Sequence, residues 1–114
     1  LELWAYIISM QDRNRAILNF GKRDVHFDLG YPIPLAIYRK GKLIRKIYDT
    51  EIQFKIYKMS DQHAFLFYPN HLNIQIGDLI KFGITHPCVT IDKWDFFYMI
   101  DKKHTIIEGL KTFF

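Results

Sequence analysis

The sequence predicts a mainly β fold, a small antiparallel β-barrel or sandwich that forms one domain over residues 1–114. The composition is the first observation. There are 17 isoleucines and 19 aromatic residues but only four alanines, and the former suit a pleated sheet whereas alanine suits a helix. The second observation is a series of short apolar or alternating runs, each ended by turn-forming residues. The third is that no window shows sustained helical periodicity.

The first half of the chain carries strand signals in this order: Trp4–Ser9, Ala16–Phe20, Val25–Asp28, Leu35–Arg39 and Leu43–Tyr48. The polar residues Gln11–Asn14 predict a turn between the first two runs. Lys40–Lys42, with a central glycine, predicts a hairpin between the last two. Pro32 and Pro34 predict that the segment around them is not a central strand, because proline donates no ladder hydrogen bond.

The second half carries strand signals at Ile52–Tyr57, Ala64–Tyr68, Leu72–Ile76, Leu79–Ile84, Trp94–Ile100 and Thr105–Leu110. In the first of these, Ile52, Phe54 and Ile56 fall on one face, because successive side chains of a strand point to opposite sides. The last two runs flank the polar residues Asp101–His104 and predict an antiparallel pair. All of these segments fit one small antiparallel unit.

Length and composition exclude several classes of protein. A chain of 114 residues can bury a core without disulfide staples. A single cysteine excludes a disulfide framework and a zinc finger built from CxxC pairs. No apolar run approaches the ~18 residues of a membrane span, and the segment from Leu1 lacks the basic start of a signal peptide. We therefore expect a soluble, cytoplasmic domain without a membrane partner.

The tripeptide His86-Pro87-Cys88 is the most informative short motif. In an extended segment, residues i and i+2 project to the same side, with Cα atoms roughly 6–7 Å apart. Both side chains could then reach one zinc ion, and Pro87 favours an extended His86. Two protein ligands would suit a catalytic ion whose other positions belong to water and substrate. The alternative is a buried cysteine beside an ordinary loop histidine.

A longer run around this tripeptide carries a family resemblance. Gly77–Trp94 resembles the C-terminal motif of the D-serine dehydratase and D-threonine aldolase-like proteins, which are pyridoxal-phosphate enzymes of the alanine-racemase fold type. Gly21–Val25, Asp61–Ala64 and the ending Lys111–Phe114 resemble the bacterial amino-acid-deaminase branch of the same family. The similarity extends, in order, from Trp4 to Phe114.

The resemblance implies a two-domain enzyme of which this chain matches the second domain. Family members carry a (β/α)8 barrel, whose lysine forms the Schiff base with pyridoxal phosphate, followed by a β-rich C-terminal domain. The chain alone is therefore expected to be inactive. The resemblance also implies a homodimer, D-serine or a related D-β-hydroxy amino acid as substrate, and dehydration, deamination or aldol cleavage as the reaction.

The resemblance further implies a zinc ion held by His86 and Cys88 next to the cofactor. Aldolase members commonly have an aspartate at the second ligand position. Cys88 therefore favours the dehydratase or deaminase side of the family, and a thiolate favours zinc over manganese.

Other candidate residues are less specific. His63 either faces the active site, as an orienting partner of a ligand, or is a solvated loop histidine. Asp24 either faces the site or caps a turn. His26, His71 and His104 are predicted to be surface residues without a role.

A basic cluster supports a rival function. Arg39, Lys40, Lys42, Arg45 and Lys46 lie around one predicted hairpin in a chain of net charge +4. A small basic β-barrel with exposed aromatic rings could bind nucleic acid. The alternatives are a solvated hairpin tip, or a structural or dimerisation domain without catalytic residues. Elsewhere the basic residues alternate with acidic ones, so nucleic acid is the less favoured partner.

Overall fold

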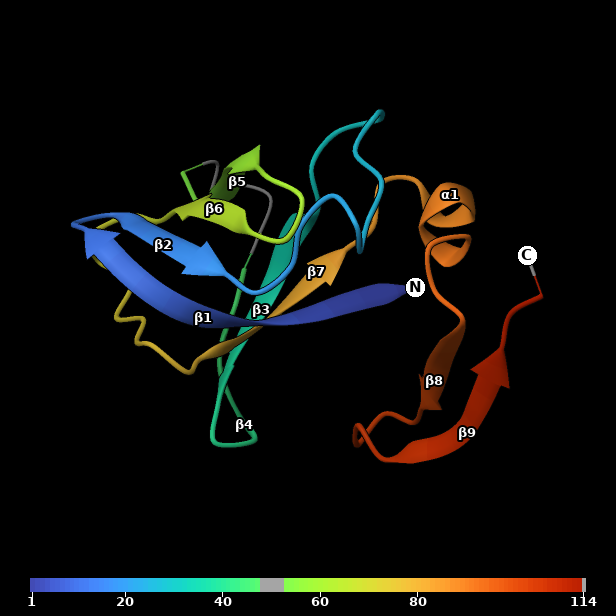
Figure 1. Ribbon diagram of the computed structural model, residues 1–114. Coiled ribbons are helices and arrows are strands. Elements are labelled where there is room, and N and C mark those ends of the chain that lie inside the picture. The colour runs from blue at the N-terminus through green and yellow to red at the C-terminus, as the bar shows by residue number, and fades with distance from the viewer. Residues whose placement is uncertain (48–52, 114) are drawn as a thin grey trace.

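The computed structural model describes residues 1–47 and 53–113, and its elements are shown in Figure 1. In chain order they are β1 (Glu2–Asp12), β2 (Arg15–Leu18), β3 (Ile33–Arg39), β4 (Lys42–Lys46), β5 (Lys55–Met59), β6 (Ala64–Phe67), β7 (Leu79–Gly83), α1 (Pro87–Ile91), β8 (Phe96–Ile100) and β9 (Ile106–Lys111). The predicted mainly β fold is confirmed. Among the described residues, no helix is long and apolar enough to cross a membrane.

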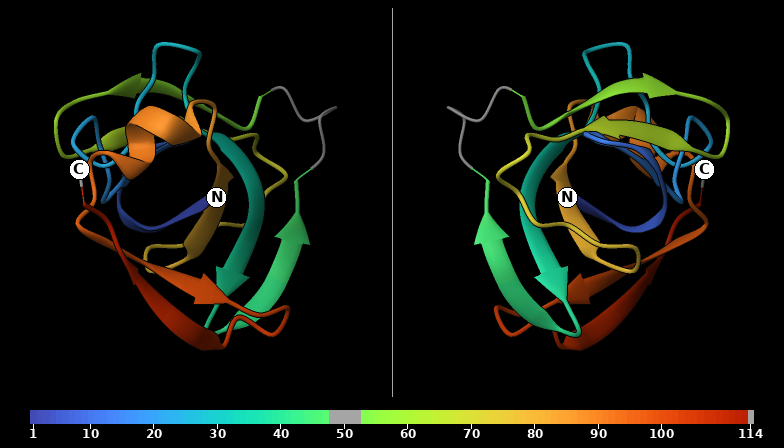
Figure 2. Two further views of the ribbon diagram at one scale, coloured as in Figure 1. Left: turned by 90° about the vertical axis from the view of Figure 1, so that its right-hand side faces the viewer. Right: turned by 90° about the vertical axis from the view of Figure 1, so that its left-hand side faces the viewer.

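Seven strands form one antiparallel sheet in the order β4-β3-β7-β1-β2-β6-β5. The sheet curls strongly, as Figure 2 shows. Within the described part of the chain its order is linear, with β4 and β5 as the two edges, so hydrogen bonds do not close it into a barrel. β8 and β9 form a separate antiparallel pair, as the sequence predicted.

Alternating apolar residues of the sheet form one core. In β1, Ala5 and Ile7 are buried while Tyr6 is half exposed, which is the alternation expected of a strand with one solvated face. The remaining core positions are Ala16, Leu18, Phe20, Val25, Ile37, Phe54, Ile56, Met59, Ala64, Leu66, Tyr68, Leu72, Ile74, Ile80 and Phe82. Phe54 and Ile56, which were predicted to share one face of a strand, are both buried. Ile52 and Tyr48 lie outside the described residues.

Two predicted strands are wrong. Val25–Asp28 and Leu72–Ile76 form loops, although Leu72 and Ile74 are buried. Alternation predicts which side chains enter the core, but a strand also needs a free neighbour. β7 already pairs with β1 on one side and β3 on the other, so the segment before it has no open edge there.

The prediction that the proline segment is not a central strand is also wrong in part. Pro34 belongs to β3, which lies between β4 and β7. The ladder to β4 begins only at Ala36, and the ladder to β7 shifts register between Pro34 and Ala36. Proline is therefore tolerated at the start of this strand, where the irregular ladder does not require its missing donor.

A buried ion pair fastens the loop before β7 to β3. The Asp78 side chain is 1% exposed. It accepts hydrogen bonds from Arg39 Nε at 2.8 Å, from Arg39 Nη2 at 2.9 Å and from the Gln75 backbone N–H at 2.8 Å. Nη2 of Arg39 also donates to the Asn73 carbonyl. The hydrogen bonds to Asp78 raise the pKa of the Arg39 guanidinium.

This pair gives a stability prediction. Arg39→Met keeps the length of the side chain but leaves the buried Asp78 carboxylate without its charged partner. We expect the free energy of unfolding to fall by about 3 kcal/mol, because an unpaired buried charge is strongly destabilising. Chemical denaturation measures the change. Lys42→Met, on the exposed strand β4, is the matched control, and equal losses in the two variants would contradict the assigned role.

The β8–β9 hairpin contacts the rest of the domain near the start of β8 and at its turn. Near the root of β8, Trp94 Nε1 donates to the Asp24 carbonyl at 2.6 Å. At its turn, the His104 ring packs against Trp4 and Tyr38, with ring centroids 4.9 and 5.3 Å away. His104 is exposed, as predicted, but its ring contacts also link the hairpin turn to β1 and β3. We call β8–β9 and its turn the strap.

Candidate metal centre

His86 lies where the chain leaves β7 and enters the short helix α1. It is the N-cap residue, with non-helical backbone (φ −135°, ψ 82°), and Pro87 occupies the first helical position. The prediction of an extended His86–Cys88 segment is wrong beyond His86. The fixed φ of proline suits the first turn of a helix, and the Thr90 N–H closes that turn on the His86 carbonyl. Cys88 consequently lies on α1, where it is exposed.

Thr90 ties this helix to a loop far away in the sequence. Its side chain is buried at 4% exposure. Its Oγ1 donates to the His86 carbonyl at 2.9 Å and accepts from the His26 backbone N–H at 3.2 Å. A second link is the bond from Thr85 Oγ1 to the Gly30 carbonyl, at 2.7 Å. The loop 26–30 is thus held against residues 85–90.

Three potential metal ligands meet across this contact. His86 Nδ1 lies 2.7 Å from Asp28 Oδ1, and His26 Nε2 lies 3.4 Å from the same oxygen. The two imidazole rings meet edge to face, with centroids 5.6 Å apart. Among the described residues, His26, Asp28 and His86 are the group of three His, Cys, Asp or Glu side chains whose ligand atoms lie within 4.8 Å of one another. Cys88 is not a member of this group.

The electrostatics of the group favour a charged Asp28. The hydrogen bond with His86 lowers the pKa of the Asp28 carboxyl below its ordinary value. The positive charge that His86 or His26 carries when protonated acts in the same direction, against the effect of desolvation. His26 Nδ1 is buried and has no hydrogen-bond partner in the described part of the chain.

The other predicted site residues lie elsewhere. Asp24 Oδ2 accepts a hydrogen bond from the Gly21 N–H at 2.9 Å, so this side chain caps a turn, which was the alternative given to it. His63 is exposed in the turn before β6, and its carbonyl accepts from Ser60. Neither residue is part of the histidine–aspartate group.

The two short motifs that contain Asp24 and His63 do meet in space. The backbone N–H groups of Lys22 and Arg23 donate to the carbonyls of Ser60 and Asp61, at 2.9 and 3.0 Å. A Cβ atom at Gly21 would lie 2.5 Å from the Asp61 backbone. Only glycine fits this approach without a shift of one chain.

Sequence reasoning missed Asp28 and misjudged His26. The predicted surface residue His26 is half-buried, with its ring against His86. A signal was available: His26-Phe27-Asp28 has the same i, i+2 spacing of ligand types as His86-Pro87-Cys88. The local sequence did not indicate that these two tripeptides face each other, because Asp28 and His86 are 58 residues apart in the chain.

The basic cluster offers fewer free charges for binding nucleic acid than the sequence suggested. β3 and β4 form the predicted hairpin, and Lys40, Lys42 and Lys46 are exposed on it. The Arg39 guanidinium, however, is bound to the buried Asp78. Arg39, the first residue of the basic cluster, therefore has a structural role in the fold.

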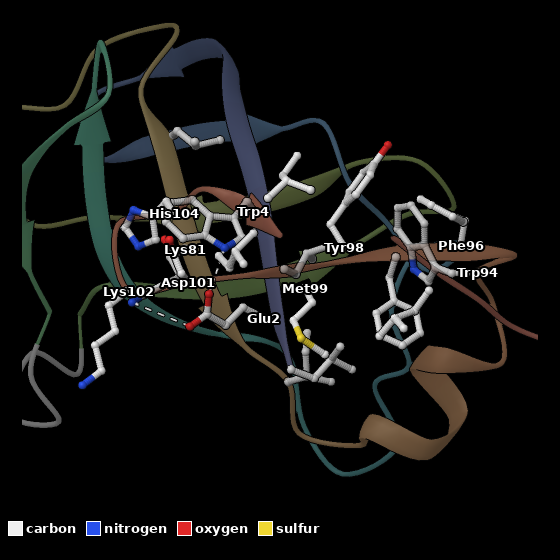
Figure 3. Close-up of a pocket in the computed structure, with 18 of the residues that line it drawn as sticks. Glu2, Trp4, Lys81, Trp94, Phe96, Tyr98, Met99, Asp101, Lys102 and His104 are labelled. Atoms are coloured by element: carbon white, nitrogen blue, oxygen red, sulfur yellow. Dashed lines mark hydrogen bonds and ion pairs between the residues drawn. The ribbon is translucent and has the colours of Figure 1, made fainter. Parts of the chain in front are cut away.

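An apolar groove lies between the strap and the sheet (Figure 3), with a volume of about 1150 Å³. Trp4 and His104 stand at one end of it, and Trp94 and Phe96 at the other. Its apolar lining includes Leu1, Leu3, Ile84, Ile91, Met99 and Leu110. Ile91 belongs to α1, so the helix that carries Cys88 also borders the groove.

Comparison with known proteins identifies the family. The sequence matches the family described as "Putative serine dehydratase domain" over residues 1–100. The chain belongs to this family. The match includes both His86 and Cys88, and the resemblance inferred from the sequence motifs is thereby confirmed. No curated protein matches the sequence significantly.

The serine dehydratase domain also has a counterpart among solved structures. The D-threonine aldolase from Filomicrobium marinum superposes with a TM-score of 0.75 at 20% sequence identity. The alignment covers 96% of this chain and 26% of the aldolase chain. At this identity the similarity shows a shared fold, and the chain spans about a quarter of the length of the aldolase.

The Thr90 link gives a prediction for the site. Thr90→Val is nearly isosteric but removes the acceptor of the His26 N–H and one donor to the His86 carbonyl. We expect the free energy of unfolding to fall by about 1–2 kcal/mol, the usual result of leaving a buried polar group unpaired. Thermal and chemical denaturation measure it. Thr105→Val, at an exposed threonine, is the control, and the link would be unimportant if both variants matched the wild type.

Proposed function

We propose that this chain is the metal-binding C-terminal domain of a lyase that uses pyridoxal phosphate and zinc. The substrate would be D-serine or a related D-β-hydroxy amino acid. The observation that carries the proposal is the family match over residues 1–100, which includes His86 and Cys88. The shared fold with a D-threonine aldolase supports the same context.

The donor set of His86 and Cys88 fits zinc. Zinc accepts imidazole nitrogen and thiolate sulfur, and thiolate disfavours the harder manganese ion. Cys88 is exposed on α1, two residues after His86, so its sulfur is open to an ion. Two protein ligands would leave positions for water and substrate, as a catalytic zinc site requires.

The proposed chemistry needs charge stabilisation at two places. When bound, pyridoxal phosphate would supply an electron sink, and zinc would supply Lewis-acid stabilisation of negative charge on an oxygen of the substrate. His86 and Cys88 would hold the ion at a fixed place on the domain surface. Their positions are set by the N-cap of α1 and by Thr90. Dehydration, deamination and aldol cleavage are the reactions that such an arrangement would serve.

We further propose that the remaining part of the enzyme, a (β/α)8 barrel that binds the cofactor, packs against the strap side of this domain. The strap exposes several large apolar side chains: Phe96, Tyr98, Met99, Ile106 and Ile107 are each at least 43% exposed. Apolar patches of this kind usually mark an interaction surface. A homodimer, as the family resemblance implies, would place a second subunit near the same site.

One prediction of the proposed function concerns the proposed ligands in the full-length enzyme. We expect His86→Ala and Cys88→Ala each to weaken zinc binding by more than about 100-fold, since even partners outside the ligand shell contribute 10–100-fold. Deamination of D-serine should fall with the zinc content, while the absorbance of bound pyridoxal phosphate should persist. Metal analysis and assay of 2-oxo acid release measure these effects.

The matched control is Asp92→Ala, which removes an exposed side chain at the other end of α1. It should retain zinc and activity. Full zinc content and full activity in both ligand variants would contradict the proposed site.

Another prediction of the proposed function concerns the chain of 114 residues by itself. We expect it to release no 2-oxo acid from D-serine when pyridoxal phosphate and zinc are added, because the cofactor-binding lysine would belong to the barrel. The full-length enzyme is the positive control. Turnover by the 114 residues alone would contradict the proposal that a separate barrel domain supplies the cofactor-binding lysine.

A further inference from the structure

We propose that Asp28 is the positioning residue of the metal centre. In this proposal, which rests on the proposed function above, Asp28 accepts the proton of His86 Nδ1 in a hydrogen bond. Nε2 of His86 is thereby left with the free lone pair that binds the ion.

The assignment follows from the chemistry of the two groups. A neutral imidazole carries one proton, on either Nδ1 or Nε2, and an ionised carboxylate offers only acceptors. Because His86 Nδ1 lies 2.7 Å from Asp28 Oδ1, the proposal assigns the single proton of the neutral ring to Nδ1. A carboxylate bound to the second ring nitrogen fixes the tautomer and the ring orientation of a ligand histidine, and it increases the basicity of the ligand nitrogen.

The backbone on both sides keeps this pair together. Thr90 Oγ1 joins the His26 N–H to the His86 carbonyl, and Thr85 Oγ1 donates to the Gly30 carbonyl. These two links flank Asp28 on the loop and also bracket His86. Neither link uses the His86 ring or the Asp28 carboxylate, so the two segments are held together by groups outside the proposed site.

The distances favour an orienting role for Asp28 over direct ligation. Two ligand atoms on a tetrahedral zinc, with bonds of about 2.0–2.1 Å, stand about 3.3 Å apart. The separation of 2.7 Å between Asp28 and His86 is that of a charge-assisted hydrogen bond. His26 Nε2 lies 3.4 Å from the same oxygen, so it contacts Asp28 from a second direction without replacing His86.

The decisive experiment reads the proton directly. In full-length enzyme with ¹⁵N-labelled histidine and no metal, two-bond ¹H–¹⁵N correlation spectra report which nitrogen of His86 is protonated. We expect Nδ1–H in the wild type and a mixture of tautomers in Asp28→Ala. The His86 signals are assigned by their absence from His86→Ala. Protonation of Nε2 in the wild type would overturn the proposal.

Metal binding provides the second readout. We expect Asp28→Ala and Asp28→Asn to weaken zinc binding about 10–100-fold, the usual effect of losing an orienting partner. The cobalt-substituted variants should keep the thiolate-to-metal absorption band, since His86 and Cys88 would still bind. His26→Ala and Asp92→Ala are the controls and should change zinc affinity less than Asp28→Ala does. Zinc affinity within twofold of wild type in both Asp28 variants would overturn the proposal.

The remaining outcomes separate this inference from the proposed function. If Cys88→Ala loses zinc and Asp28→Ala does not, the positioning role fails and the ligand pair stands. If Cys88→Ala keeps zinc while His26→Ala and Asp28→Ala both lose it, the ion is held directly by His26, Asp28 and His86. That result would overturn both the positioning role and the ligand role of Cys88.

Discussion

The buried carboxylate of Asp78 is the constraint on which the rest of the structure depends. Its side chain binds Arg39 of β3, its carbonyl accepts the Ile7 N–H of β1, and β7 begins at the next residue. Three adjacent strands of the sheet are therefore joined at one residue that water does not reach. A buried charge is tolerated only when it is paired and fully hydrogen-bonded, so this junction admits few alternative arrangements.

The position of the candidate metal centre follows from that junction. β7 is held at its start by Asp78 and along its length by β1 and β3. Thr85 and His86 follow shortly after its C-terminal end. The loop that carries Asp28 meets them there through the Thr85 and Thr90 hydroxyl groups. The rigid sheet thus sets the approach of two loops, which is how a precise polar contact can form at the surface.

In the proposed function, the two ligands His86 and Cys88 and the orienting carboxylate of Asp28 would lie on one helix and one loop of this domain. The remaining part of the active site would then come from the proposed barrel. This agrees with a chain that spans about a quarter of the length of the similar aldolase. The groove under the strap and the candidate metal centre share α1, so a partner that packs on the strap would lie close to that centre.

The sequence by itself determined the antiparallel β class, most strand positions, the β3–β4 and β8–β9 hairpins and the family, because alternation, turn residues and motifs are local properties. It also singled out His86 and Cys88. Only the tertiary structure decided that a helix begins at Pro87, that Leu72–Ile76 is a loop in which Leu72 and Ile74 are buried, and that Asp28 faces His86. Each of these depends on which neighbours a segment meets. Asp28 and His86 are 58 residues apart, and no local pattern encodes a contact that exists only once β7 is paired on both sides.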